Sequence, residues 1–338
     1  MTAARIPPAP WFEDLERGAV LDDAPAATLT SGLAAAHQAI LGDRLRLALD
    51  APLATRVTGL DGPLAHPALV CDLAIGQSTG VTQRVRANLF YRGLVLLRPV
   101  AIGDTLRTTT TIEGLRENRR REGRPPTGLA VLHIVTVDQQ QRPVLDFRRC
   151  AMLPLRPDAP ATGCADDVDA VPDALDPRAL RAVTAGWDLE GFRAASPHGR
   201  HAADLAVGER IAVVGGDVVS SAPELARLSL NVASVHHDAR EAGGRRLVYG
   251  GHTIGIAAAQ LTRALPNLLT IVGWKRCDHL APVHEGDTLR SAVEVTAIEP
   301  LDGGGALVHL RVSVRADGPG TEDEGTPVLA WELIGAMA

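Results

Sequence analysis

Aromatic residues are scarce in this sequence, and so are cysteines. Phe, Trp and Tyr make up 3% of the 338 residues, so a hydrophobic core has to be built mainly from aliphatic side chains. The four cysteines are scattered without a CxxC pair or a metal-ligand spacing: Cys71, Cys150, Cys164 and Cys277. A disulfide framework and a cysteine metal site are therefore not expected, and reduced thiols in the cytoplasm are the simplest interpretation.

The sequence also lacks a basic block, an N-terminal signal core and a long apolar run. The formal net charge is −6, which argues against a dedicated nucleic-acid-binding protein. The first residues, MTAARIPPAPWFEDL, have no apolar core, and no stretch approaches the roughly 18 uninterrupted apolar residues of a membrane span. We therefore expect a cytoplasmic protein with neither a nucleic-acid nor a membrane partner.

An internal repeat organises the chain. The segment LRPVAIGDTLR (97–107) returns as LAPVHEGDTLR (280–290), an offset of 183 residues. The apolar runs around His133 and His309 also match, and FEDLERG near the start of the first copy resembles AADLAVG in the second. Three matches in the same order predict two copies of one domain.

Each copy predicts the same succession of elements. A first helix and an irregular stretch precede a second, more apolar helix, expected at 67–80 and 252–265, and four strand-like runs follow. In the second copy we expect these strands at 269–279, 288–298, 306–315 and 327–334. The domains are predicted at 1–153 and 201–338, joined by a linker at 154–200 rich in Pro, Ala and Asp. The predicted fold class is α+β, a double hotdog with a long antiparallel sheet wrapped around two central helices.

Residues 230–255 read LNVASVHHDAREAGGRRLVYGGHTIG and carry the polar groups that could do chemistry. Together with the repeated PVxxGDTL motif, the GGHTIG turn before an alanine-rich helix resembles the MaoC-like acyl-CoA hydratase/dehydratase family. The pattern N-x4-H followed by RRLVYGGH is similar to the mesaconyl-CoA hydratase branch of that family. The double-length form also resembles uncharacterised actinobacterial double-hotdog proteins.

The resemblance implies an (R)-specific enoyl-CoA hydratase or 3-hydroxyacyl-CoA dehydratase. His236 matches the family histidine and is expected to be the general base, while Asn231 stands where the family has an aspartate and would orient the water. An amide cannot exchange protons at neutral pH, so this change puts the proton transfer on His236. The N–H of Gly251, at the start of the central helix, would hold the negative thioester oxygen. Neither a cofactor nor a metal is implied, since coenzyme A is part of the substrate.

Further residues of this segment are candidates for substrate binding. Arg245 and Arg246 could hold a coenzyme A phosphate or an acyl carboxylate, or could equally be solvated loop charges. His252 could assist His236 at the mouth of the site, or could stabilise the turn by a hydrogen bond. The complete predicted substrate-binding set is His252, Tyr249, Gly250, Arg245 and Arg246.

The first copy is expected to be catalytically degenerate. Asp43 occupies the family aspartate position, but Ala48 stands at the histidine position. His66 and Pro67 replace the His-Gly pair, and proline lacks the N–H that an oxyanion hole needs. The first copy is then expected to complete the sheet and shape an acyl tunnel, with a secondary pocket formed by Asp43, His66, Asn88 and Tyr91.

Two other functions remain open. A hotdog thioesterase would need a carboxylate on the central helix, and GHTIGIAAAQLTRAL has none. A non-catalytic acyl-CoA-binding protein would fit if Asn231 marks lost chemistry and His236 is only a cap or surface residue. A metal site at His236, His237 and Asp238 is disfavoured, because adjacent histidines cannot easily reach one ion and no third ligand is suitably spaced. The expected partner is an acyl-CoA thioester, with a homodimer left open.

Overall fold

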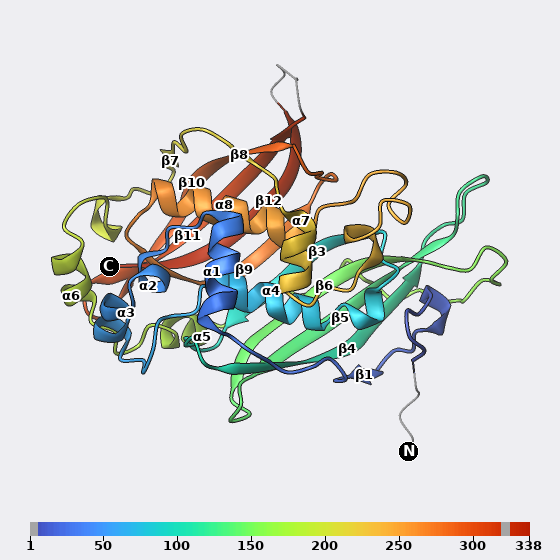
Figure 1. Ribbon diagram of the computed structural model, residues 1–338, viewed down its shortest axis with the longest axis horizontal. Coiled ribbons are helices and arrows are strands. Elements are labelled where there is room, and N and C mark those ends of the chain that lie inside the picture. The colour runs from blue at the N-terminus through green and yellow to red at the C-terminus, as the bar shows by residue number, and fades with distance from the viewer. Residues whose placement is uncertain (1–5, 319–324) are drawn as a thin grey trace.

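The computed structural model describes residues 6–318 and 325–338, and it contains one antiparallel sheet of 12 strands. Along the sheet the order is β1-β4-β5-β6-β3-β9-β12-β11-β10-β7, with β2 paired to β4 and β8 to β10 (Figure 1). The two halves meet where β3 pairs with β9. The long strands are β3 (Ala87–Leu96), β4 (Thr105–Glu117), β5 (Thr127–Val137), β6 (Pro143–Pro154), β9 (Leu268–His279), β10 (Thr288–Leu301), β11 (Gly305–Asp317) and β12 (Thr326–Met337).

Short strands and helices complete the structure. The short strands, all at the sheet edges, are β1 (Val20–Leu21), β2 (Ala27–Thr28), β7 (Arg210–Ile211) and β8 (Asp217–Val218). The helices are α1 (Ser31–Leu41), α2 (Arg46–Leu49), α3 (Ala51–Thr58), α4 (Pro67–Gln77), α5 (Pro177–Ala182), α6 (Leu189–Ala195), α7 (Ala222–Leu228) and α8 (Gly250–Ala264). The 3-10 turns are η1 (Phe12–Asp14), η2 (Gly80–Thr82), η3 (Ala202–Asp204) and η4 (Ser234–His236). Across the described ranges, no helix is both long and apolar enough to cross a membrane.

The repeat seen in the sequence is accompanied by the same hydrogen bond in both halves. In the first half the Ala101 N–H donates to Asp104 Oδ2 over 2.9 Å, and in the second the His284 N–H donates to Asp287 Oδ2 over 2.8 Å. Both turns therefore have the same local structure at the same position before a long strand. The expected α+β double-hotdog architecture is confirmed.

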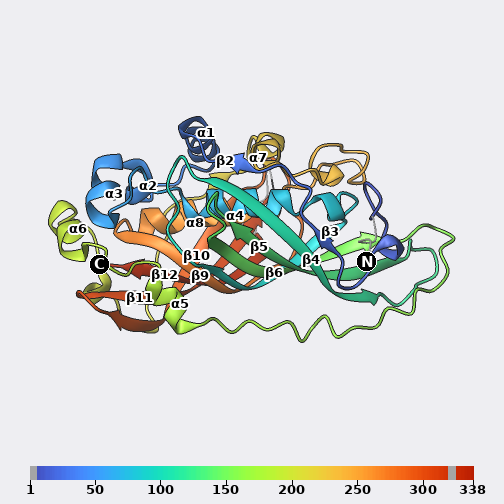
Figure 2. The same ribbon diagram turned by 90° about the horizontal axis from the view of Figure 1, so that it is seen from below.

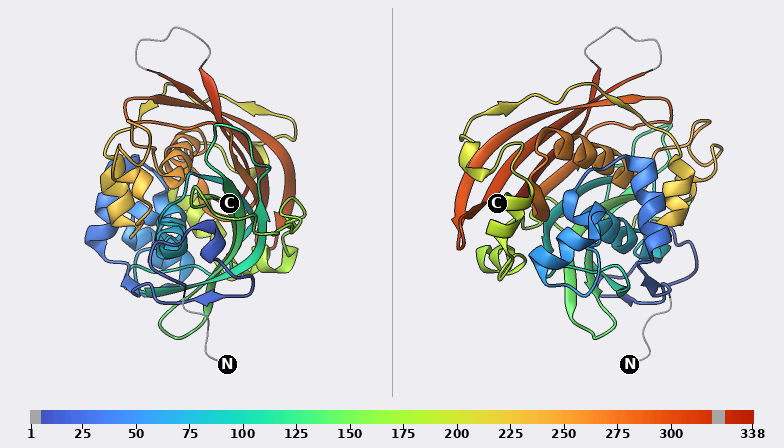
Figure 3. Two further views of the ribbon diagram at one scale, coloured as in Figure 1. Left: turned by 90° about the vertical axis from the view of Figure 1, so that its right-hand side faces the viewer. Right: turned by 60° about the vertical axis from the view of Figure 1, so that its left-hand side comes forward.

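The helices α4 and α8 lie in the hollow of the curved sheet (Figure 3). Every residue of α4 is buried, and most of α8 is buried as well, which matches their lack of a polar face. Gln77 and Gln260 hold the two helices to the sheet in the same way, through Nε2 donation to the Leu106 and Leu289 carbonyls. The observed α8 begins at Gly250, two residues before the expected start, because Tyr249 is the N-cap.

The connection between the halves crosses the outer face of the sheet (Figure 2). Its residue Val168 is buried against Leu129, Val131 and Cys150 on β5 and β6. Beyond that crossing the chain forms α5 and then α6. The predicted domain limits, 1–153 and 201–338, remain predictions, since the sheet runs without interruption through both halves.

Candidate functional site

A cavity of about 350 Å³ lies between the two halves. This volume is in the range of small-molecule sites. Both halves contribute residues that the sequence singled out, namely Asn88 and Tyr91 on β3, and Asn231, His236, Tyr249 and Gly250 in the second half. The predicted secondary pocket is thereby divided, because Asn88 and Tyr91 belong to this main cavity while Asp43 and His66 do not.

His236 is placed in this cavity as a neutral imidazole. Its Nδ1 lies 2.8 Å from the Leu247 carbonyl oxygen, which can only accept, so Nδ1 carries the proton and donates. Nε2 then keeps a free lone pair. Burial lowers the pKa of His236 to about 4, and the side chain contacts the ring of Tyr249 edge-on. A base is thus present in its deprotonated form at neutral pH.

The loop that carries Asn231 is held by the first half of the chain. A Cβ at Gly76 on α4 would lie 1.6 Å from the Ser229 carbonyl oxygen, so only glycine permits this approach. The Val232 N–H donates to Thr79 Oγ1 over 3.0 Å. Leu230 has a φ of 63°, an uncommon conformation for a non-glycine residue and one that recurs at functional sites. The first half therefore holds the loop that carries Asn231 as well as completing the sheet.

Asn231 itself is buried and oriented by a short local bond. Its Oδ1 accepts the Ala233 N–H over 2.9 Å, which leaves the amide Nδ2 with two donor hydrogens. Its carbonyl oxygen accepts from His237 Nε2 over 2.7 Å. The Asn231 side chain is therefore positioned to donate toward the cavity that it lines.

The start of α8 opens on the same cavity. Its N-cap, Tyr249, makes no side-chain cap, and the first N–H groups of a helix have no intrahelical partner. Gly250 lines the cavity, whereas Gly251 does not. A Cβ at Gly251 would meet Asp72 Oδ1 and the Tyr249 ring, so this glycine is required by internal packing. At Gly250 a Cβ would lie 2.6 Å from His279 Nε2.

The other predicted binding residues of this segment lie outside the cavity lining. His252 has no solvent exposure, burial lowers its pKa to about 4, and neither ring nitrogen has a hydrogen-bond partner among the described residues. Arg246 is exposed and pairs with Glu285 over 2.7 Å. Arg245, also exposed, lies 3.6 Å from an Asp287 carboxylate oxygen. The two arginines are thus surface charges on the loop before α8.

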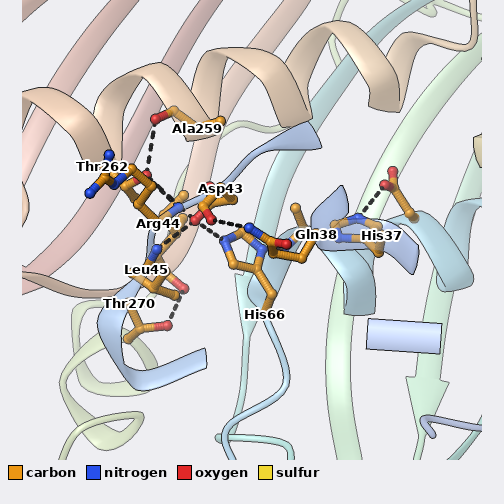
Figure 4. Close-up of polar contacts among 12 residues, drawn as sticks. His37, Gln38, Asp43, Arg44, Leu45, His66, Ala259, Thr262 and Thr270 are labelled. Atoms are coloured by element: carbon orange, nitrogen blue, oxygen red, sulfur yellow. Dashed lines mark hydrogen bonds and ion pairs between the residues drawn. The ribbon is translucent and has the colours of Figure 1, made fainter. Parts of the chain in front are cut away.

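Asp43 and His66 line a separate cavity of about 30 Å³. Figure 4 shows their contact with each other. The Ala68 N–H donates to His66 Nδ1 over 3.0 Å, so the proton is on Nε2, which lies 2.9 Å from Asp43 Oδ1. Burial acts to raise the pKa of Asp43, but His66 and the Leu45 N–H outweigh it and lower the pKa. Both nitrogens of His66 are therefore engaged, unlike those of His236.

Sequence reasoning missed several charged or polar residues of the main cavity, among them His279 and Arg149. His279, at the end of β9, packs against Tyr91, and its Nε2 has no hydrogen-bond partner in the described structure. Burial lowers the pKa of His279 to about 4. Arg149 reaches the cavity from β6. The sequence feature that could have identified Arg149 is the pair Arg148-Arg149. Neighbouring residues of a strand point to opposite faces of the sheet, so one of the two arginines has to point inward.

In the part of the chain that the structure describes, no group of three or more His, Cys, Asp or Glu side chains is placed to hold a metal ion. The cavity instead combines a neutral imidazole, an amide and an open helix N-terminus. Such a combination can deprotonate a water molecule and stabilise negative charge on an oxygen atom.

No family model matches the chain. Two relatives match over most of its length. The chain is 32% identical over 328 residues to a protein named β-methylmalyl-CoA dehydratase from Chloroflexus aurantiacus, covering 93% of this chain and 90% of the relative. It is 31% identical over 319 residues to one named mesaconyl-CoA hydratase from Cereibacter sphaeroides, covering 91% and 90%.

Solved structures agree with this relationship. A conserved hypothetical protein of Mycobacterium tuberculosis, described as having a double hotdog fold, is similar with a TM-score of 0.88 and 50% identity, covering 98% of this chain and 99% of that one. A MaoC domain protein dehydratase from Chloroflexus aurantiacus gives a TM-score of 0.84 and 28% identity, with coverage of 98% and 97%.

Proposed function

Because this chain belongs to the MaoC-like double-hotdog family of CoA-thioester hydratases and dehydratases, we propose that it adds water to a 2-enoyl-CoA or removes it from the matching 3-hydroxyacyl-CoA. The observation that carries the proposal is the neutral His236, whose Nε2 lone pair is free in a cavity that also receives the open end of α8. The proposed stereochemistry is (R)-specific. No cofactor takes part, and coenzyme A enters as part of the substrate.

The chemistry follows from these groups. His236 Nε2 takes a proton from a water molecule to which Asn231 Nδ2 donates, and the water oxygen attacks the β-carbon of the enoyl group. The electron pair moves onto the thioester oxygen, where the free N–H of Gly250, at the start of α8, stabilises the enolate. The protonated His236 then returns the proton to the α-carbon. Dehydration follows the same steps in reverse.

Three exposed arginines on segments that contribute to the cavity lining suit the phosphates of coenzyme A. Arg86 lines the cavity and is solvent-exposed, while Arg245 and Arg246 lie on the loop before α8. Their carboxylate contacts at Asp287 and Glu285 are partly exposed and are weak enough to exchange for a phosphate. The cytoplasmic location and the homodimer stay predictions from the sequence.

One central helix does carry a carboxylate, the group that the thioesterase alternative requires. Asp72 lies on α4, a central helix, but it is buried, pairs with His37 over 3.1 Å and does not line the main cavity. The cavity therefore favours hydration over hydrolysis.

The direct test is to incubate the purified protein with 2-enoyl-CoA thioesters of different acyl groups. Hydration removes the absorbance of the conjugated enoyl thioester without releasing a thiol, whereas hydrolysis releases free coenzyme A. Chiral analysis of the product then checks the (R) configuration. Thiol release at the rate of substrate loss would establish the thioesterase, and binding without turnover of any thioester would establish the non-catalytic alternative.

Variants of Asn231 test its role in orienting water. Asn231→Ala should lower kcat with little change in KM, because the water loses a donor that acts in the transition state. Asn231→Asp restores the residue common in the family and should retain or raise activity. Steady-state kinetics of both variants decide the point. An Asn231→Ala enzyme with a normal kcat would exclude Asn231 from the reaction.

The pH dependence of the rate should report the buried base. Burial lowers the pKa of His236 to about 4. The imidazole therefore stays in its neutral, active form at every pH above that value. For hydration we expect kcat/KM to be nearly constant from neutral pH down to about pH 5 and to fall below that, whereas an unperturbed histidine would give a fall near ~6.5. Circular dichroism at each pH separates loss of the base from unfolding. A rate that falls through pH 6.5 in folded protein would contradict this assignment.

A further inference from the structure

The first half contains a counterpart of the main cavity, related to it by the internal repeat. Beside the main cavity the Val248 N–H donates to the Val283 carbonyl oxygen over 2.9 Å. At the repeat offset of 183 residues, the Ala65 N–H donates to the Val100 carbonyl oxygen over 2.8 Å, beside a second cavity. The linings also correspond at this offset, so that Leu247, Gly250 and Thr253 of the main cavity match Leu64, Pro67 and Val70 of the second.

This counterpart is almost completely filled. Its volume is about 10 Å³, whereas that of the main cavity is about 350 Å³. Two of the side chains that line it, Val183 and Trp187, belong to the connection between the halves and to neither copy of the repeat. Both are buried, and Trp187 is 8% exposed. The chain itself thus takes up in the first half the space that is open to a ligand in the second.

The connection is held firmly on both sides of Trp187. Leu180 on α5 and Phe192 on α6 are buried in the same apolar cluster as Trp187. The next residue, Asp188, donates its N–H to the Val57 carbonyl oxygen on α3 over 2.8 Å, and its Oδ1 caps α6. The indole of Trp187 is therefore kept in place by two anchored helices.

The wall of the counterpart suits an apolar group and cannot support the proposed reaction. Leu96 stands at the position of His279, and Val70 at that of Thr253. Pro67 replaces Gly250 at the start of the central helix and has no N–H to offer to a thioester oxygen. An apolar cavity in a protein interior stays free of water and binds hydrocarbon groups.

We propose that the first half holds a second, unreactive site for the acyl chain of a thioester, and that Trp187 occupies this site as an internal ligand. The choice of an acyl chain rests on the proposed function of the main cavity, whereas the occupation by Trp187 does not. Removing the indole should uncover the site, since an engineered apolar cavity of about 150 Å³ is enough to bind benzene. Because Trp187 is partly exposed, we expect the uncovered site to reach the surface, with coenzyme A remaining outside.

The test is the number of hexanoyl-CoA molecules bound per chain, measured by calorimetry with a saturated thioester that cannot be hydrated. Wild type should bind one molecule, in the main cavity, and Trp187→Ala should bind two. The matched control is Phe192→Ala, which removes a buried ring of the same connection that lines neither cavity, and it should bind one. Hydration of an enoyl-CoA per folded molecule should be unchanged in Trp187→Ala, because Trp187 lies outside the main cavity lining.

The outcomes separate this inference from the proposed function. If Trp187→Ala does not fold, as judged by circular dichroism, Trp187→Leu is measured in the same way, because leucine keeps an apolar side chain in the cluster. A wild type that binds no hexanoyl-CoA, together with a Trp187 variant that binds one molecule, would contradict the proposed function and leave the second site standing. A folded Trp187 variant with the wild-type number of bound molecules would overturn the proposal and reduce Trp187 to core packing. So would an additional molecule in Phe192→Ala, because any gap in the connection would then be sufficient.

Discussion

Replacing His236 by alanine is expected to lower kcat by about 10²–10⁴-fold, the usual contribution of a general base. The expectation follows from the geometry of the ring: Nδ1 is committed to the Leu247 carbonyl, and Nε2 is the remaining basic atom in the cavity-lining side chain. KM should change little, because the imidazole acts on the water and not on the acyl-CoA. Steady-state kinetics with an enoyl-CoA that the wild type hydrates measure the loss.

The control for this variant is His198→Ala, an exposed histidine outside the cavity lining, which should keep wild-type turnover. Thermal unfolding checks that His236→Ala is folded. A shifted melting temperature with unchanged turnover would mean that His236 only packs against Tyr249 and caps the loop. The structure then makes His279 the next candidate base, since His252, the alternative suggested by the sequence, is fully buried outside the cavity lining.

The sequence predicts the fold well because the repeat and the local patterns agree. The matches around Asp104 and Asp287 require the same turn twice, and the small, apolar residues of α8 suit a helix surrounded by a sheet. The sequence says less about details set by contacts between distant segments. Gly251, whose N–H was expected to hold the thioester oxygen, lies against Asp72, a residue of the other half, and Gly250 lines the cavity.

The chemical state of the site could not be predicted from the sequence at all. The tautomer of His236 depends on a carbonyl 11 residues away, at Leu247. Arg149 and His279 come from strands of different halves and meet the cavity only because β3 pairs with β6 on one side and with β9 on the other. Neither residue belongs to a motif. The pair Arg148-Arg149 indicates that one of the two arginines points inward, but not which one or what it contacts.

Replacing His66 by alanine is expected to destabilise the protein by about 1.5–3 kcal/mol, the usual contribution of a hydrogen bond to a charged group. The variant removes the His66 Nε2 that lies 2.9 Å from Oδ1 of the buried Asp43 carboxylate. The other carboxylate oxygen, Asp43 Oδ2, already has no hydrogen-bond partner among the described residues. The variant also removes the side chain that accepts the Ala68 N–H at the start of α4. Chemical denaturation followed by circular dichroism measures the change in the free energy of unfolding.

Turnover per folded molecule should stay near the wild-type value in both His66→Ala and Asp43→Ala, because His66 has no free lone pair and this pair lines only the small cavity. The double variant separates a structural pair from a catalytic one. With both partners removed no buried charge remains unpaired, so the double variant should be more stable than the sum of the two single losses predicts. A loss of turnover in folded Asp43→Ala as large as that of His236→Ala would instead show that the first half carries a second active site.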